Sequence, residues 1–468
     1  MKRIIKKIPI YIGVFLISLT VMLGFLVLSA KVTKESVQEN FEESAELVCE
    51  NDVFFYVEED VNPSCIDRYA DSILLNIAYN FEPDNALESV MWASFYSDPR
   101  KDENITFSET VNEGKEKNKQ YLRYWHGSAG VIRILHTFLN LGQIYVVHGV
   151  ILITLLGVLI FLLIRSKCIL EAVALGLSMV AVSIWYVPFS LEYTWVFICM
   201  LSFSIATVVL VRKNKEKYLG VLFMLSGMVT IFLDFLTTET LTFTIPMLLI
   251  LVLRKHEYQK GVLLKESRAR NDIDKGNVSG KKSEIESDNK LGKREGVWNG
   301  IKGILKYLVP WGIGYIGMWV SKWIVASAVL GENAMPYVTE HIEERIGGSI
   351  GSVSFFEYLW LAVSRNIKEL FPLDYGVGGA IIIGIIVLVI AYFCFVYKRK
   401  KVEWEYIVLL LIIGVVPIVR FMILRNHSTL HYFFVHRALA GTVFAILLSV
   451  GHIIDFGMFR KSRRNGKK

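Results

Sequence analysis

The stretch IYVVHGVILITLLGVLIFLLI, residues 144–164, contains no Asp, Glu, Lys or Arg. An α-helix needs about 20 consecutive apolar residues to cross the hydrocarbon core of a bilayer, so this stretch predicts a transmembrane helix. Nine further runs of this character occur, at residues 8–30, 169–189, 195–211, 219–236, 241–253, 304–330, 377–397, 406–424 and 433–456. We therefore predict an all-α polytopic membrane protein with about ten transmembrane helices. The composition, with 53% apolar residues and a mean hydropathy of +0.44, agrees with that class.

Basic residues cluster beside the apolar runs and predict the orientation of the chain. With ten spans, all of these clusters fall on one side of the membrane, and the positive-inside rule places that side in the cytoplasm. The opposite side carries residues 31–143, a large loop with 21 acidic and 10 basic side chains. We expect a multi-pass protein of the cell membrane with both termini in the cytoplasm and residues 31–143 outside. The basic clusters are Lys2, Arg3, Lys6 and Lys7; Arg165 and Lys167; Arg212, Lys213, Lys215 and Lys217; Arg254 and Lys255; Lys398, Arg399, Lys400 and Lys401; and Arg460, Lys461, Arg463 and Arg464.

A polar connector divides the chain into two membrane halves. Residues 254–300 are charged and nearly free of aromatic side chains, which is typical of a flexible linker. The sequence therefore predicts an N-terminal half over residues 1–253 and a C-terminal half over residues 301–468. The second half has its own outer loop, residues 331–376, in which FFEYLWLAVSRNIKELF (355–371) predicts an amphipathic helix at the membrane interface.

Two aspartates in the first outer loop are candidates for catalysis. In CIDRYADSILLNIAYN, residues 65–80, Asp67 and Asp71 stand four residues apart within a helical pattern of apolar residues. A carboxylate held beside a membrane in this way could take a proton from an incoming hydroxyl. The alternative is an ordinary solvated helix, because a loop with this many acids will often place two of them at that spacing.

Several cationic residues are expected near the outer membrane surface. Arg123 and His126, in RYWHG, have the chemistry to bind a phosphate at the headgroup level, or they belong to an interfacial aromatic belt. Lys322 lies within an apolar span, where a charge costs roughly 2.5–3.5 kcal/mol, so we expect it to face a cavity or a partner, or to extend toward the interface.

The short turn before the last apolar run adds a second cationic group. His427 and His431 share the i,i+4 spacing of metal ligands, but no glutamate accompanies them in a metalloprotease pattern. A patch for an anionic lipid headgroup is the preferred interpretation. Asp234 lies at the outer end of another hairpin and should have a cationic partner. The other cations of the turn that we consider for binding are Arg420 and Arg437.

The order of these features resembles the GT-C superfamily of integral membrane glycosyltransferases. Shared features are a first span, an outer loop with the acidic motif DRYADSILLNIAY (67–79), the return segment RYWHG (123–127), and a bundle with a second outer loop. The sequence departs from the family in three ways: Arg68 replaces the second acid of the family's pair, Asp67 lies much farther from the first span, and neither outer loop contains an Asp-x-Asp motif.

The resemblance implies transfer of a sugar from a polyprenyl-phosphate donor to a glycan, lipid or protein hydroxyl on the outer face. Asp71, or alternatively Asp67, would act as general base, while Arg123, Lys322 or Arg420 would hold the donor phosphate. No cofactor is certain, and a divalent metal stays open. The competing hypotheses are a transporter or lipid flippase of cell-envelope precursors, which would explain the charges within the spans, and a non-catalytic assembly protein. No feature points to nucleic acid.

Overall fold

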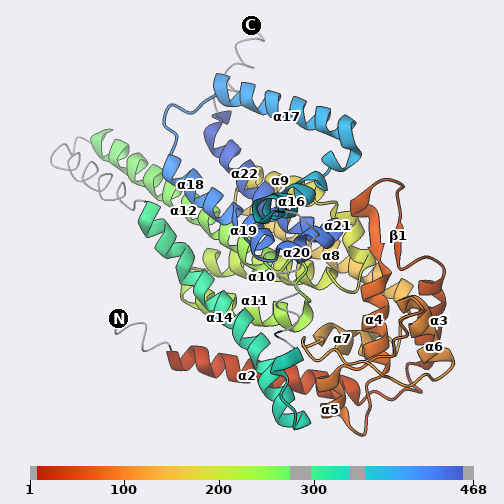
Figure 1. Ribbon diagram of the computed structural model, residues 1–468. Helices are drawn as coiled ribbons and strands as arrows, with labels where there is room; N and C mark the ends of the chain where they lie inside the picture. The colour runs from red at the N-terminus through yellow and green to blue at the C-terminus, as the bar shows by residue number, and fades with distance from the viewer. Residues whose placement is uncertain (1–7, 275–296, 338, 340–353, 457–468) are drawn as a thin grey trace.

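The computed structural model describes residues 8–274, 297–337, 339 and 354–456, and most of these residues are helical (Figure 1). The one sheet of this described part is a two-stranded antiparallel ribbon, in which β1 (Phe54–Tyr56) pairs with β2 (Cys65–Asp67). The predicted all-α class is confirmed.

Eight helical stretches of the described chain are long and apolar enough to cross a membrane, which confirms a polytopic membrane protein by length and composition. Pro417 marks a break in one of them, since proline favours a helix start over a helix interior. The eight stretches are α2 (Ile8–Ala30), α8 (Leu141–Arg165), α10 (Thr194–Arg212), η3 with α11 (Glu216–Tyr218, Leu219–Leu233), α14 (Val297–Leu330), η5 with α17 (Leu373–Tyr375, Gly376–Val396), α18 with α19 (Trp404–Gly414, Val416–Ile423), and α21 with η6 and α22 (Tyr432–Val435, His436–Leu439, Ala440–Ile453).

The other two predicted runs do not form single apolar helices of span length. The run at 169–189 forms α9 (Ile169–Ala181), which is too short to span alone, followed by the 3-10 helix η2 (Ile184–Phe189). The run at 241–253 opens α12 (Leu241–Asp274), so the helix continues where the sequence predicts a linker. The remainder of the predicted linker, residues 275–296, lies outside the described residues.

The basic segments between the helices meet at one end of the molecule, which we call the basic end. Arg254 pairs with Glu216, and Lys255 pairs with Glu403. The backbone N–H of Arg399 donates to the carbonyl of Ile453 over 2.9 Å. These contacts join the turn before α11, the middle of α12, the start of α18 and the end of α22.

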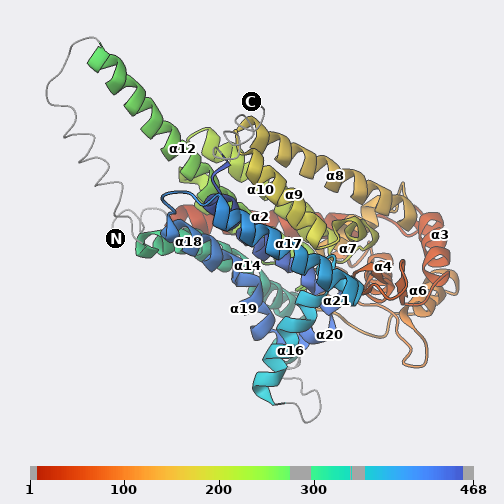
Figure 2. The same cartoon turned by 90° about the horizontal axis from the view of Figure 1, so that it is seen from above.

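Residues 31–140 fold as a helical unit against the opposite end, which we call the loop end (Figure 2). Its apolar side chains form one continuous core with α2, α11 and α14. The indole of Trp125 donates to the carbonyl of Met318 in α14 over 2.7 Å, which fixes the unit to the bundle. The helices of the unit are α3 (Gln38–Cys49), α4 (Arg68–Tyr79), α5 (Ala86–Trp92), α6 (Glu103–Asn112) and α7 (Gly127–Leu135).

Two glycines allow α11 and α14 to approach backbone to backbone. A Cβ at Gly227 would lie 2.2 Å from the carbonyl oxygen of Trp311, and a Cβ at Gly314 would lie 2.2 Å from that of Met224. Each helix thus offers a glycine to the backbone of the other. Small residues at such contacts are typical of packed transmembrane helices.

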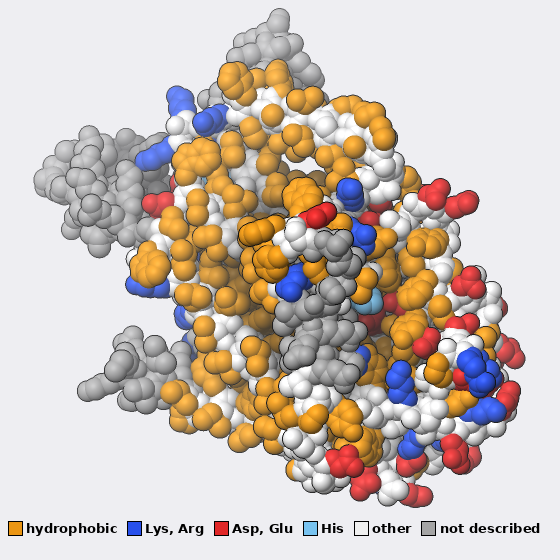
Figure 3. All heavy atoms as spheres, in the orientation of Figure 1, with side chains coloured by type: hydrophobic (Ala, Val, Ile, Leu, Met, Phe, Trp, Pro, Cys, Tyr) orange, Lys and Arg blue, Asp and Glu red, His pale blue; other side chains and the backbone are white. Residues whose placement is uncertain are grey.

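Apolar side chains dominate the surface over the long helices, whereas charged side chains gather over the loop unit, at the lower right of Figure 3. The extreme case is α17, in which Gly379 is the one buried residue. The helix arches across the top of Figure 1. A soluble protein would not leave so apolar a helix uncovered, so lipid is the expected neighbour.

The loop unit contains two cysteines, Cys49 and Cys65. Both are free thiols in the structure, with Cys49 exposed and Cys65 buried.

The amphipathic helix predicted within residues 331–376 is confirmed as α16 (Phe355–Lys368).

Candidate functional site

The two predicted aspartates occupy the start of α4, and both are buried. Asp67 ends β2 and is the N-cap of the helix, with its Oδ1 accepting a hydrogen bond of 2.9 Å from the Ala70 N–H. Aspartate is among the best N-caps because its carboxylate satisfies a free backbone N–H of the first turn. The relative exposure is 3% for Asp67 and 0% for Asp71. The interpretation as a solvated helix is therefore wrong for these two residues.

Asp71 is held by donors from α8 and from the turn between η2 and α10. Its carboxylate accepts hydrogen bonds from the Leu191 N–H over 2.8 Å, from the Ser190 hydroxyl over 3.5 Å, and from the Tyr145 hydroxyl. Arg68 donates to the same tyrosine oxygen. Burial raises the pKa of Asp71 to about 6, although the charge of Arg68 and the Tyr145 hydrogen bond act in the opposite direction. Asp71 thus fastens α4 to the bundle.

Asp67 is less constrained. Among the described residues, the bond from the Ala70 N–H is the one hydrogen bond of its side chain. Burial raises the pKa of Asp67 to about 7; the Ala70 bond lowers it and the nearby charge of Asp71 raises it. A carboxyl group with a pKa near neutrality is suited to accept a proton.

Arg437 is the predicted cation that shares a buried neighbour, Tyr193, with the two aspartates. Its Nη2 donates to the carbonyl of Pro63 over 2.8 Å, two residues before β2, and its guanidinium lies 4.9 Å from the ring centre of Tyr193. The Tyr193 hydroxyl is buried, has no hydrogen-bond partner in the described part of the chain, and lies where the charges of Asp67 and Asp71 act on it. We call Asp67, Asp71, Tyr193 and Arg437 the aspartate–arginine cluster.

The predicted histidine pair borders this cluster. The rings of His427 and His431 lie 4.7 Å apart, as their i,i+4 spacing predicts. Phe434 lies 5.5 Å from His431 and stacks on Tyr193 at 5.4 Å. The turn before the last span therefore reaches Tyr193 through aromatic contacts.

Lys322 and Arg420 have other protein partners. Lys322 donates to the carbonyls of Val90 and Met91 over 3.1 and 2.9 Å, and so caps the end of α5. It is buried and anchors the loop unit to α14. Arg420 forms a buried ion pair with Glu239 at 2.9 Å.

Asp234 belongs to the same buried group as this ion pair. Its carboxylate accepts hydrogen bonds from the backbone and hydroxyl of Thr237, and the charges of Glu239 and Arg420 both act on it. The expectation that Asp234 has a cationic neighbour agrees with this arrangement. Arg420 is thereby committed to the acids of the 234–240 hairpin.

Arg123 and His126 lie where the loop unit meets α14. The guanidinium of Arg123 lies 4.2 Å from the ring centre of Tyr121. The indoles of Trp319 and Trp323 donate to the backbone carbonyl of Arg123. His126 is buried, which lowers its pKa to about 3, with a further contribution from the charge of Lys322. At neutral pH this histidine is therefore uncharged, which makes it a poor binder of a phosphate.

Sequence reasoning missed Arg68, Tyr145 and Tyr193. A tyrosine at the edge of an apolar run is usually an interfacial anchor, and nothing in its spacing points to a carboxylate more than 70 residues away.

No protein-family model, no curated protein and no solved structure matches this chain.

Proposed function

We propose that this protein is a membrane glycosyltransferase of the GT-C type, which moves a sugar from a polyprenyl-phosphate donor to a hydroxyl on the outer face. The observation that carries the proposal is the aspartate–arginine cluster. In it, two buried carboxylates of the loop unit and a guanidinium of the last membrane segment all act on the buried Tyr193, at one end of an apolar bundle.

Asp67 is the proposed general base, and Asp71 is a positioning residue. The acceptor hydroxyl transfers its proton to the Asp67 carboxylate while its oxygen bonds to the anomeric carbon of the donor sugar. The bond from that carbon to the phosphate oxygen breaks, and the electron pair leaves with the polyprenyl phosphate. Asp71 cannot take this role as easily, since three donors already occupy its oxygens.

Arg437 is the proposed stabiliser of the phosphate leaving group. Its Nε has no hydrogen-bond partner among the described residues, so the guanidinium has donor capacity left for an anion. Arg437 takes the place that the resemblance assigns to Arg123, Lys322 or Arg420. The donor and acceptor, like the sugar, are part of the proposal.

The proposed topology has ten crossings, with the basic end in the cytoplasm and both termini there. Its support is that α9 with η2 reaches from one end to the other. Glu171 in its first turn contacts His256 at the basic end, and Ser190 just after η2 contacts Asp71 at the loop end. The short helix thus covers the distance of a span together with η2.

The test is transfer from a radiolabelled polyprenyl-phosphate sugar in proteoliposomes, comparing Asp67→Asn with Asp102→Asn. Asp102 is the N-cap of α6 and accepts from the Ile105 N–H over 3.0 Å, just as Asp67 caps α4. Asparagine caps a helix as well as aspartate does, so both variants keep their helix starts. We expect Asp67→Asn to lose about 10²-fold or more of the transfer rate and Asp102→Asn to lose none.

Equal transfer by Asp67→Asn and the unmodified protein would overturn the assignment of the base. Wild-type protein that transfers no sugar but carries lipid-linked sugars across the bilayer would support the flippase hypothesis instead.

A further inference from the structure

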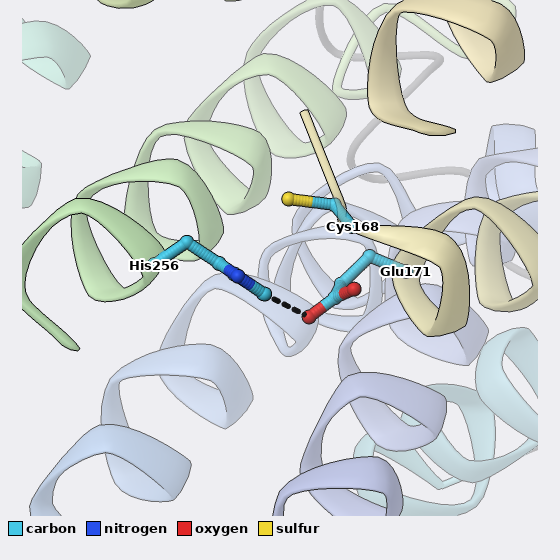
Figure 4. Close-up of side chains that lie close together, drawn as sticks. All are labelled: Cys168, Glu171 and His256. Atoms are coloured by element: carbon cyan, nitrogen blue, oxygen red, sulfur yellow. Dashed lines mark hydrogen bonds and ion pairs between the residues drawn. The ribbon is translucent and has the colours of Figure 1, made fainter. Parts of the chain in front are cut away.

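Three side chains with metal-ligating atoms meet at the basic end, far from the aspartate–arginine cluster (Figure 4). They are Cys168, Glu171 and His256, and their ligating atoms all lie within 4.8 Å of one another. The Nε2 of His256 lies 2.8 Å from a carboxylate oxygen of Glu171. Within the described ranges, this is the one group of three such side chains with this proximity.

The local fold brings the first two residues to one face. Lys167 has a φ of +63°, so the chain reverses sharply after α8, and the Cys168 N–H donates to the carbonyl of Leu163 over 2.9 Å. Cys168 is the N-cap of α9, and Glu171 lies in its first turn. Residues three apart on a helix are neighbours, so the thiol and the carboxylate point the same way.

The third residue comes from another rigid element. His256 lies in α12, just beyond the apolar part of that helix. Two helices that are distant in sequence therefore supply the three side chains, and a ligand between them would join the α8–α9 turn to α12.

The donor set has the chemistry of a zinc site. Zn²⁺ favours thiolate, imidazole and carboxylate ligands in tetrahedral geometry. Nitrogen and oxygen ligands at about 2.0–2.2 Å from a tetrahedral ion lie roughly 3.3 Å from each other. The observed His256–Glu171 separation of 2.8 Å needs to widen only slightly to admit the ion.

The cluster has room for a fourth ligand. Glu171 and His256 line a cavity of about 670 Å³ between α9, α12 and α22, whose wall also includes His452. His452 is nine-tenths buried, and its Nε2 has no hydrogen-bond partner in the described part of the chain. A zinc ion with three protein ligands and an open position toward this cavity would bind water, an anion or this histidine as the fourth ligand.

We propose that Cys168, Glu171 and His256 bind a divalent transition-metal ion, with Zn²⁺ as the preferred ion, at the basic end of the protein. The site is separate from the proposed sugar transfer and does not depend on it. On the proposed topology it faces the cytoplasm, where thiols stay reduced and available as ligands.

The test uses the full-length protein, purified in mild detergent from cells grown with zinc, and measures metal content and Zn²⁺ affinity. We compare Cys168→Ser and His256→Gln with Cys199→Ser, because Cys199 is another buried thiol, located on α10. We expect about one zinc per chain in the unmodified protein and in Cys199→Ser, and a loss of ~10-fold or more in affinity for the two ligand variants.

Cobalt substitution separates a thiolate ligand from non-specific binding. Co²⁺ in the proposed site should give a thiolate-to-cobalt charge-transfer band that Cys168→Ser removes, while the melting temperature shows that the variant is folded. If the unmodified protein gives no such band, or if Cys168→Ser binds Zn²⁺ as tightly, the cluster is only a hydrogen-bonded histidine–glutamate pair.

Discussion

At the residue scale, Asp67 serves the fold and the proposed chemistry with one carboxyl group. One oxygen caps α4, and burial raises the pKa of the carboxyl group to about 7. Asp71, four residues on, has a similar burial but three donors. The difference between the two aspartates lies in their partners, and the sequence pattern contains no information about those partners.

The transfer rate should therefore rise with pH around neutrality. The Asp67 pKa is about 7, and only the deprotonated carboxylate can accept a proton from the acceptor hydroxyl. We expect the rate to increase roughly tenfold per pH unit below that value and to level off above it. A rate measured from about pH 5.5 to 8.5 that stays constant would mean that another group is the base.

The same shift predicts how stability depends on pH. Because the folded-state pKa of Asp67 lies above its ordinary value of 3.8, the protonated form favours the native state. That contribution is present in full below the ordinary pKa and is lost as the pH rises through about 7. Asp67→Asn, which cannot ionise, should show a flatter pH dependence of its melting temperature than Asp102→Asn.

At the element scale, the molecule depends on the close approach of α11 and α14. The glycine contacts leave no space for a side chain, and the atoms on the other side are backbone atoms that cannot turn away. The same helices carry the 234–240 hairpin at one end and Lys322 along one face. Their spacing therefore controls the position of the loop unit relative to the bundle.

Gly227→Ala should lower the stability of the protein by about 1–3 kcal/mol, because the added methyl group overlaps the Trp311 carbonyl. Gly157→Ala in α8 is the matched control, since a Cβ there meets nothing within 4 Å. The stability of both variants is measured by thermal unfolding in detergent, with size-exclusion chromatography as the readout. If the two variants melt alike, the close approach of the helices is not needed for stability.

At the scale of the whole molecule, the sequence predicts the helices better than their partners. The apolar runs and the amphipathic stretch correspond closely to α8, α14 and α16, because each is defined by residues that are adjacent in the sequence. The partners of Lys322 and Arg420 come from segments that are distant in the chain, and no local pattern specifies them. The composite segment of α9 and η2 also breaks the helical period that prediction uses.

The number of crossings can be tested at Lys213, which follows α10. With ten crossings this residue lies in the cytoplasm; if α9 did not cross, it would lie outside. We expect Lys213→Cys, in a background with Cys49→Ser, to react with a membrane-impermeant maleimide only after the membrane is opened. Lys115→Cys in the loop unit should react in intact cells. Labelling of Lys213→Cys in intact cells would contradict the proposed topology.

The exposed helix α17 implies that acyl chains are a structural component of this protein. One buried residue is too little protein contact to hold a long apolar helix in place, so its orientation depends on the hydrocarbon around it. Lipid tails would then fill the space beside the helix in the way that ordered water fills polar cavities of a soluble protein. Bilayer thickness, rather than side-chain packing, would set the tilt of α17. Exchange of the native lipids for a short-chain detergent would therefore change the orientation of this helix before that of the others.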